Sequence, residues 1–507
     1  MQFTFLIIII VYFLSRFSSL LREILIANFF GATRITDAYA SVVAINFKWS
    51  TILSVLLYIT LIPVLIKYKH REIENSDYVL FNTVTLILLF ITSIMSLIIF
   101  IGADVLIKFI APGFDFETHK LAVFLLRLTS PILILYTLSM LLRIYNTSKG
   151  RYRVAILTDL ASALIILGGI LCLVHLWGIR GVGISFLLGA GFSSLSQLPW
   201  ILRERIHLFR KINFTHPGLR EIFALILPLI FAILIFEITT FVTYRLASTL
   251  FEGCIAVLNY GFTINQFFVG LIEAGMLGII FPKLSESLAQ ENKGDFKNLV
   301  TMYLKIIFLV IIPISVFIIL LRKEIITLLF QRGRFDMEST TLTSLSLLAY
   351  SVGLFAWAID MLFFRVIYLL RKIKFLLFSI IFRAVVNIIL CLVLIRYLGF
   401  IGLALAFSIA SIVNFLISIT FLNRLFNGLL NIEIIKTISK IIASSFFIFV
   451  FILVLNNFVE LSAIRKIIIN VVIGSILYLA LLSLLKVKET RLIKKLLEEC
   501  FCKLKLF

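Results

Sequence analysis

The sequence predicts an all-α polytopic membrane protein with about fourteen transmembrane helices. Three observations support this fold class: an apolar composition, a succession of long apolar runs, and an internal repeat. The 507 residues are 62% hydrophobic and 14% charged, with a mean hydropathy of +1.14. Soluble domains are typically about 45 to 50% apolar, so the composition excludes a soluble fold.

Each expected span is a run of about 20 apolar residues, the length of helix that crosses a bilayer. The N-terminal run MQFTFLIIIIVYFL carries no basic segment and no cleavage site before Arg16, so we expect it to be retained as the first span. The expected spans are 3–29, 38–66, 78–103, 119–142, 154–177, 180–202, 221–249, 254–281, 299–321, 339–364, 373–395, 400–423, 436–457 and 466–485.

The net charge of +21 would suggest a nucleic-acid partner for a soluble protein. Here Lys and Arg concentrate in the short loops that follow the even-numbered spans and in the C-terminal tail, as the positive-inside rule expects. We therefore expect no nucleic-acid partner, a location in the bacterial cytoplasmic (inner) membrane, and both termini in the cytoplasm.

An internal repeat occurs at a shift of 221 residues. The motif at Phe114-Asp115-x-Glu117 recurs at Phe335-Asp336-x-Glu338, and the glycine motif that begins at Gly178 recurs at Gly399. The shift places span one on span seven, so the two copies share one orientation, as in transporters built from parallel lobes around a central site. The expected organisation is an N-lobe (1–202), a cytoplasmic linker (203–220), a C-lobe (221–425), two further helices (426–487) and a cytoplasmic tail (488–507).

Ionisable residues inside the first two spans are the leading candidates for a binding site. Arg16 and Arg22 lie in span one and Lys48 in span two, where a charge is costly unless it faces a cavity or a partner. Guanidinium groups make bidentate contacts with phosphate oxygens. These three residues are therefore predicted to bind a phosphate or pyrophosphate group.

Three acidic residues are candidates for coupling or gating. Glu23 adjoins Arg22, Asp37 lies in the turn before span two, and Glu273 lies in a glycine-rich stretch of span eight. Asp37 has the alternative role of capping the second helix, and Glu273 the alternatives of balancing a cavity charge or binding a coupling cation. Arg143, Arg245 and Arg365 are expected to reach the membrane interface from the ends of their spans.

Catalysis has little support in the sequence. It contains no glycine-rich phosphate loop, no HExxH motif and no nucleophile motif. The five His and five Cys lack metal-ligand spacing. We expect no enzyme activity, no metal and no cofactor, apart from a coupling cation of unknown identity.

Several motifs resemble a known family, the MviN/MurJ lipid II flippases of the multidrug/oligosaccharidyl-lipid/polysaccharide exporter superfamily. The first span and the turn after it resemble the family's opening SR...VRE..A..FGAS...DAF pattern. The matching segments are Ser15-Arg16, Leu21-Arg22-Glu23, Phe29-Phe30-Gly31-Ala32 and Thr36-Asp37-Ala38-Tyr39, with Ile62-Pro63-Val64-Leu65, Ile280-Phe281-Pro282-Lys283-Leu284-Ser285 and Gln331-Arg332-Gly333-Arg334-Phe335 later in the chain.

The resemblance implies fourteen spans, two lobes around a cationic cavity, and alternating access. It also implies a cargo, undecaprenyl-pyrophosphate-linked peptidoglycan precursor (lipid II), moved from the inner to the outer leaflet for cell-wall biogenesis and cell shape. Arg16, Arg22 and Asp37 fall on positions that the family uses for transport, with the arginines holding the pyrophosphate. The last two spans would form a groove for the lipid tail.

The chain departs from the family pattern at two places. An arginine pair usual in span two is replaced around Lys48, and the Ala-Asp-Arg-Leu of span eight reads Gly261-Phe262-Thr263-Ile264. Three alternatives therefore stay open: a flippase for another polyprenyl-linked glycan of O-antigen or capsule type, an exporter of organic cations, and a non-transporting scaffold that contacts the cell-wall synthesis machinery. An exporter of organic cations requires an acidic pocket, against which the first-span arginines argue.

Overall fold

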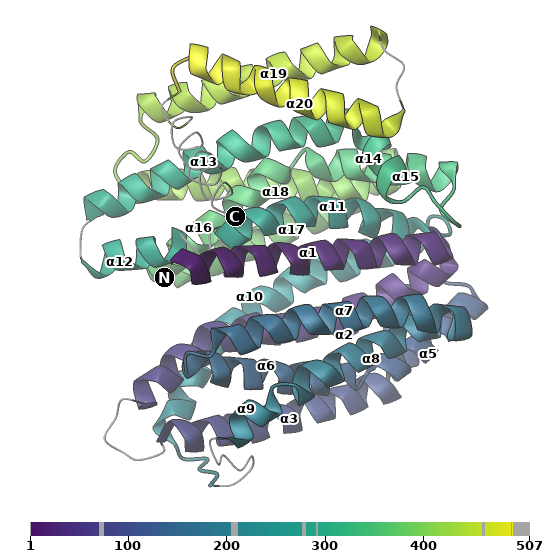
Figure 1. Ribbon diagram of the computed structural model, residues 1–507, viewed down its shortest axis with the longest axis vertical. Coiled ribbons are helices and arrows are strands. Elements are labelled where there is room, and N and C mark those ends of the chain that lie inside the picture. The colour runs from purple at the N-terminus through teal and green to yellow at the C-terminus, as the bar shows by residue number, and fades with distance from the viewer. Residues whose placement is uncertain are drawn as a thin grey trace. The chain divides into compact units, whose positions relative to one another are not determined.

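The computed structural model describes residues 2–69, 76–203, 211–275, 280–290, 293–458, 462–487 and 489. Across these ranges the chain forms helices and no β-strand (Figure 1). The helices form two compact units, Met1–Asn259 with Gly333–Phe335, and Tyr260–Arg332 with Asp336–Phe507. The predicted all-α fold class is confirmed.

Unit 1 is built around a core that α2, α3, α6 and α10 share. Tyr68, Phe81 and Tyr145 are fully buried there, and the rings of Phe81 and Tyr145 lie 4.5 Å apart. Leu219 and Ile222 of α10 belong to the same core. The helices of unit 1 are α1 (Gln2–Phe30), α2 (Arg34–Lys69), α3 (Ser76–Ile101), α4 (Ala103–Ile110), α5 (Phe116–Thr129), α6 (Ile132–Ser148), α7 (Tyr152–Trp177), α8 (Ile179–Leu195), α9 (Leu198–Leu202) and α10 (Pro217–Ala247).

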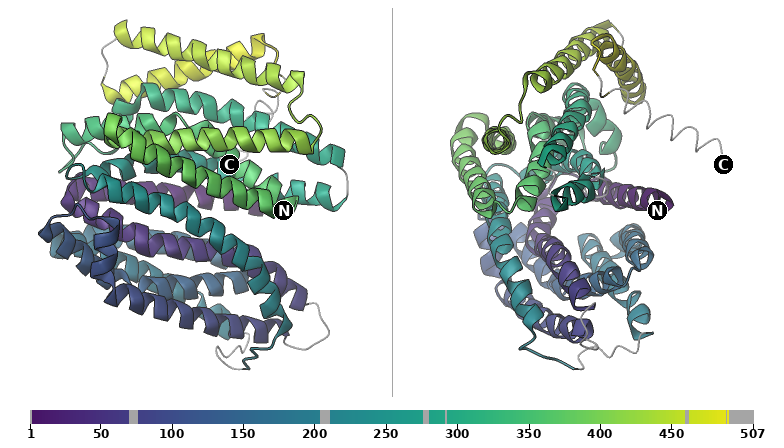
Figure 2. Two further views of the ribbon diagram at one scale, coloured as in Figure 1. Left: turned by 180° about the vertical axis from the view of Figure 1, so that it is seen from behind. Right: turned by 90° about the vertical axis from the view of Figure 1, so that its left-hand side faces the viewer.

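Unit 2 continues from α11 (Cys254–Gly275), whose first residues belong to unit 1. The helices α19 and α20 lie side by side, as the yellow pair in Figure 2 shows, and α19 packs on α13. The Tyr478 hydroxyl donates to the Leu309 carbonyl at 2.8 Å and holds α20 on α13. The other helices are α12 (Phe281–Ala289), α13 (Lys293–Leu320), α14 (Arg322–Leu329), α15 (Met337–Ser351), α16 (Leu354–Leu369), α17 (Ile373–Leu398), α18 (Phe400–Leu425), α19 (Ile432–Phe458) and α20 (Ala463–Leu484).

The repeat seen in the sequence is also a repeat of helices. The helices α7 and α17 each contain 26 residues, and each ends at a glycine that begins the next helix. Those glycines, Gly178 and Gly399, adopt φ angles of +57° and +55°, a region that side-chain-bearing residues avoid. Asp115 and Asp336 both occupy N-cap positions, of α5 and α15, although only the Asp336 side chain accepts a hydrogen bond from the helix backbone, from the Ser339 N–H. Each half therefore repeats the same local structure.

Ten helices in the described residues are long and apolar enough to cross a membrane, or eleven if the pair α15 and α16, bent by 47°, forms one span. This agrees with a polytopic membrane protein. The expected spans 3–29, 38–66 and 221–249 correspond to α1, α2 and α10. The count of fourteen, the lobe boundaries and the cytoplasmic termini stay predictions, and the compact units divide the chain after Asn259, beyond the predicted linker.

Candidate functional site

The candidate site in unit 1 is a polar cluster centred on Glu23 of α1. Its carboxylate is 4% exposed and Oε1 accepts from Arg22 at 3.1 and 3.2 Å and from the Tyr39 hydroxyl at 3.5 Å. Asn259 Nδ2 donates to Oε2 at 3.5 Å. These four residues form what we call the Glu23 cluster. A buried charge requires such donors, and residues of α1, α2 and α11 supply them to Glu23.

Arg22 is half-buried, as is Asn259, and it is the positively charged member of the Glu23 cluster that an outside ligand can reach. Its side chain is 24% exposed, and its guanidinium lies 5.1 Å from the centre of the Phe186 ring of α8. A cation over an aromatic face is stabilised electrostatically. The guanidinium is therefore positioned by Glu23 on one side and Phe186 on the other.

Arg16 is half-buried on α1, six residues before Arg22. Six residues of α-helix correspond to a rise of about 9 Å and a rotation that leaves the two side chains about 120° apart around the axis. The two arginines therefore project from different faces of the helix, and their joint binding of one pyrophosphate stays a prediction. Lys48 lies in α2, but its side chain is outside the described residues.

Asp37 caps the N-terminus of α11. Its alternative predicted role was to cap α2, the helix to which it belongs. It lies in the first turn of α2 and is 4% exposed. Its Oδ2 accepts from the backbone N–H of Gly253 at 2.7 Å, and its Oδ1 from that of Ala256 at 2.8 Å. These donors lie at the N-terminus of α11, where N–H groups lack partners within the helix. The beginning of α2 is instead closed by Thr36, whose hydroxyl accepts from the Thr33 N–H at 2.8 Å.

The segment that Asp37 caps approaches the end of α1 very closely. Gly253 has a φ of +86°, and a Cβ at this position would lie 2.2 Å from the Ala32 carbonyl oxygen. The loop residue Gly333, also in unit 1, makes a similar approach: its Cβ would lie 2.2 Å from the Asn28 oxygen, and the next N–H, that of Arg334, donates to the same oxygen at 3.0 Å. At this end of unit 1, the backbone at Gly253 and at Gly333 therefore packs directly against the backbone at the end of α1.

Glu273 belongs to unit 2, where it forms an ion pair with Arg365 of α16. Arg365 Nη2 lies 3.1 Å from Glu273 Oε1, and the Arg365 side chain is 14% exposed. Two of the three arginines expected to reach the membrane interface are therefore held by carboxylates. Arg365 pairs with Glu273, and Arg143 pairs with Asp159. Arg245 donates to the Phe109 carbonyl at 2.5 Å. The sequence could not show these partners because they lie on other helices.

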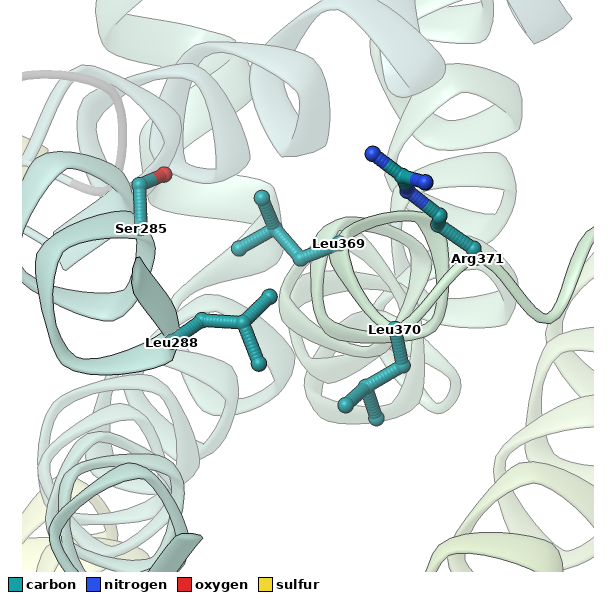
Figure 3. A pocket seen from close by; sticks show the side chains of 5 residues that line it. All are labelled: Ser285, Leu288, Leu369, Leu370 and Arg371. Atoms are coloured by element: carbon teal, nitrogen blue, oxygen red, sulfur yellow. The ribbon is translucent and has the colours of Figure 1, made fainter. Parts of the chain in front are cut away.

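A pocket of about 480 Å³ lies in unit 2 between α12 and the end of α16 (Figure 3). Its lining residues are Ser285, Leu288, Leu369, Leu370 and Arg371. None of the predicted site residues lines it. Among the residues that the structure describes, no group of three His, Cys, Asp or Glu side chains is placed to hold a metal ion.

The sequence analysis did not identify Tyr39 and Asn259 as partners of Glu23. A signal for them exists in the repeat, because Tyr39 corresponds to Tyr260, the residue next to Asn259. At that shift Asn259 itself corresponds to Ala38, the residue before Tyr39. The repeat does not reveal that Tyr39 and Asn259 both contact one carboxylate.

Comparison with known proteins supports a common origin with one family. A family model described as lipid II flippase MurJ matches residues 26–473. The probable lipid II flippase MurJ of Buchnera aphidicola subsp. Schizaphis graminum is 27% identical over 417 residues, 79% of each chain. That of Thermotoga maritima is 27% identical over 413 residues, 80% of this chain and 81% of its own.

Solved structures show the same fold. A lipid II flippase MurJ in an inward closed conformation matches with a TM-score of 0.81 at 24% identity, covering 94% of this chain and 98% of that chain. An inward-facing MATE family multidrug resistance transporter matches with a TM-score of 0.71 at 17% identity, covering 82% of this chain and 95% of its own. Since the family model spans most of the sequence, the chain belongs to the lipid II flippase MurJ family, a family of transporters and not of catalytic enzymes.

Proposed function

We propose that the protein moves lipid II, the undecaprenyl-pyrophosphate-linked peptidoglycan precursor, from the inner to the outer leaflet by alternating access. The observation that carries this proposal is the partly exposed guanidinium of Arg22, held between Glu23 and Phe186. The family relationship supports lipid flipping in general. The Glu23 cluster supports an anionic, phosphate-bearing head group.

The Arg22–Glu23 pair suits a cargo that must be both bound and released. Without cargo, Glu23 neutralises the guanidinium at 3.1 Å. A pyrophosphate offers Arg22 two or more acceptor oxygens in bidentate geometry, while Tyr39 and Asn259 remain donors to Glu23. The carboxylate therefore keeps partners when the arginine turns to the cargo, which lowers the cost of binding and of release.

Alternating access requires contacts that form in one state and break in another. The two hydrogen bonds from Gly253 and Ala256 to Asp37 are suitable contacts, because they join α2 to the first turn of α11. In this proposal they hold the end of unit 1 closed while the cargo enters, and their loss opens it. Glu273, paired with Arg365, and Arg16 are secondary candidates in the same cycle.

The test is complementation of a strain depleted of its own lipid II flippase, joined to flipping of fluorescent lipid II by the purified protein in vesicles. Wild type is expected to rescue growth and to flip lipid II. Arg22→Ala, at equal membrane levels, is expected to lose at least tenfold in flipping rate, the equivalent of about 1.4 kcal/mol. The flipping rate of Arg22→Lys should fall between those of wild type and Arg22→Ala, since lysine keeps the charge but lacks the planar guanidinium that makes bidentate hydrogen bonds.

The matched control is Arg180→Ala. Arg180 is another arginine of unit 1 that lies over an aromatic ring, that of Phe124 at 4.7 Å. Its loss is expected to leave flipping near the wild-type rate. Equal rates for wild type and Arg22→Ala would remove Arg22 from the mechanism, and failure of well-expressed wild type in both assays would contradict lipid II as the cargo.

A second candidate cargo is another polyprenyl-linked glycan. The observation that favours it is an aromatic cluster in unit 2 where the family pattern has charged residues: the Phe262 ring lies 5.2 to 5.4 Å from those of Tyr350, Trp357 and Phe407. Flipping of an O-antigen or capsule precursor in the same vesicles, with no flipping of lipid II, would support this cargo instead.

A further inference from the structure

A buried carboxylate of unit 2 lies outside the machinery described so far. Asp360 of α16 is 7% exposed, as is Asn414 of α18. Asn414 Nδ2 donates to Asp360 Oδ2 at 3.1 Å. The other oxygen of each group, Asp360 Oδ1 and Asn414 Oδ1, is fully buried and has no hydrogen-bond partner among the described residues. These two oxygens are both acceptors, so a hydrogen-bond donor between them is missing from the described part of the chain.

One proton satisfies both oxygens at once. A carboxylate has acceptors alone, whereas a carboxylic acid also has an O–H donor. A carboxylic acid and a primary amide can pair through two hydrogen bonds, with the amide N–H directed to one carboxyl oxygen and the O–H directed to the amide oxygen. The first of these bonds is present at 3.1 Å. A proton on Asp360 Oδ1 would supply the second.

We propose that Asp360 is a proton-binding site, in which a proton from water binds Oδ1 of the carboxylate and is shared with Asn414 Oδ1. One O–H bond of a hydronium ion breaks, leaving water, and one O–H bond forms at Oδ1, so the carboxylate becomes a neutral carboxylic acid. The proton leaves by the reverse step. Use of this proton in transport rests on the proposed function, whereas its binding does not.

The surroundings of Asp360 favour a proton over a metal cation. Arg383 of α17 acts electrostatically on Asp360, and its Nη2 donates to Ser411 Oγ at 3.0 Å. A sodium-sized cation would need several oxygen ligands beside this guanidinium. A proton needs one carboxyl oxygen and one acceptor, and both are present.

The other elements packed against α16 place their charges elsewhere. Lys305 of α13 pairs with Glu489, and Arg365 of α16 itself pairs with Glu273 of α11. The further titratable or charged groups on the packed helices are Lys283 and Glu286 of α12, Asp295, Lys297 and Tyr303 of α13, Glu338 and Tyr350 of α15, Lys374, Cys391, Arg396 and Tyr397 of α17, and Arg424 of α18, with Tyr368 on α16 itself. Arg383 is the charge that acts on Asp360.

The test is infrared difference spectroscopy of the purified full chain in lipid vesicles between low and high pH, with Asp residues isotope-labelled. Wild type is expected to show the C=O band of a buried carboxylic acid that disappears as pH rises. Asp360→Asn should lack this band, because an amide forms the same two hydrogen bonds without a titratable proton. Asp336→Asn, which removes an exposed Asp of the same unit, should keep it.

Arg383→Gln provides a second, independent measurement. Loss of the guanidinium removes a charge that favours the ionised carboxylate, so the band should disappear at a higher pH than in wild type. An unchanged midpoint, a band that persists in Asp360→Asn, or a band that responds to sodium concentration and not to pH would each overturn the proposal. None of these outcomes depends on flipping, so failure of the proposed cargo leaves them interpretable.

Discussion

Asp37 and Asp360 are both buried aspartates, one in each unit, and they differ in how their oxygens are satisfied. Asp37 accepts a backbone N–H on each oxygen, while Asp360 accepts one amide N–H on Oδ2 and has no donor at Oδ1 in the described structure. The first arrangement gives both oxygens a donor and holds a helix end. The second leaves one oxygen where a proton can bind. Burial alone therefore leaves the two aspartates alike, and they differ in the number of donors that reach their oxygens.

The largest effect is expected from Asp37→Ala. It leaves two buried N–H groups at the start of α11 without an acceptor, and hydrogen bonds to a charged group each contribute about 1.5 to 3 kcal/mol. We expect a loss of about 3 kcal/mol in the free energy of unfolding, measured by thermal unfolding in detergent, and roughly half of it for Asp37→Asn. A loss below about 1 kcal/mol would show that the two hydrogen bonds to Asp37 do not stabilise the fold. Asp37 would then not differ from Asp360 as a structural carboxylate.

The next effect compares two glycines of unit 1 that share a positive φ. Gly253→Ala and Gly150→Ala both place a Cβ at φ near +80° (+86° and +81°), but the first meets the Ala32 oxygen at 2.2 Å and the second meets nothing within 4 Å. Gly253→Ala is therefore expected to cost about 1 to 3 kcal/mol more than Gly150→Ala, by the same unfolding measurement. Equal costs would mean that the α11 terminus moves freely away from α1.

A smaller effect is expected from Asn414→Leu in unit 2. The substitution keeps the branched shape and the number of heavy atoms of the side chain but removes the donor to Asp360 Oδ2, a net contribution of about 1 kcal/mol to stability. Thr420→Val, at an exposed position of the same helix, should change stability by less than about 0.5 kcal/mol. If the two variants unfold alike, the Asp360–Asn414 bond does not contribute to the packing of α16 on α18.

The smallest effect belongs to Asp115, an exposed carboxylate outside the membrane spans. The hydroxyl of Thr118 and then the guanidinium of Arg34 hold the pKa of Asp115 below its ordinary value. Because the folded pKa is depressed, the contribution to stability is present at neutral pH and is lost as pH falls below about 4, through the folded pKa. Melting temperatures measured from pH 6 to 3 should fall slightly more for wild type than for Asp115→Asn, and high salt should weaken the difference. Identical melting profiles for wild type and Asp115→Asn would contradict this contribution of Asp115 to stability.

The sequence was sufficient for those features that depend on local composition. Hydropathy predicted a polytopic helical protein because each span is apolar along its own length. The repeat of the glycine motif at Gly178 and Gly399 predicted two similar copies, and the two glycines have nearly equal positive φ angles. Arg22, Glu23 and Asp37 were recognisable as site candidates because each is an ionisable residue in or beside an apolar span, and their roles stay predictions.

The partners of those residues could not be predicted, because they depend on which helices pack together. Glu23 and Asn259 are 236 positions apart, and Asp37 and Ala256 are 219 apart. Helix periodicity specifies a face but not its neighbour. The same limit applies to Asp360, whose significance depends on a single amide of α18 and on an oxygen that no donor reaches in the described structure.

The position of Arg22 and Glu23 at consecutive residues of α1 has an electrical consequence. Moving one elementary charge through 100 mV involves about 2.3 kcal/mol of work, but a guanidinium and a carboxylate that travel together contribute opposite amounts. A displacement of α1 across the membrane field therefore does no net work on this pair. If the proposed cargo and the proton at Asp360 cross the field without a counter-charge, a current recorded during turnover would report their charges.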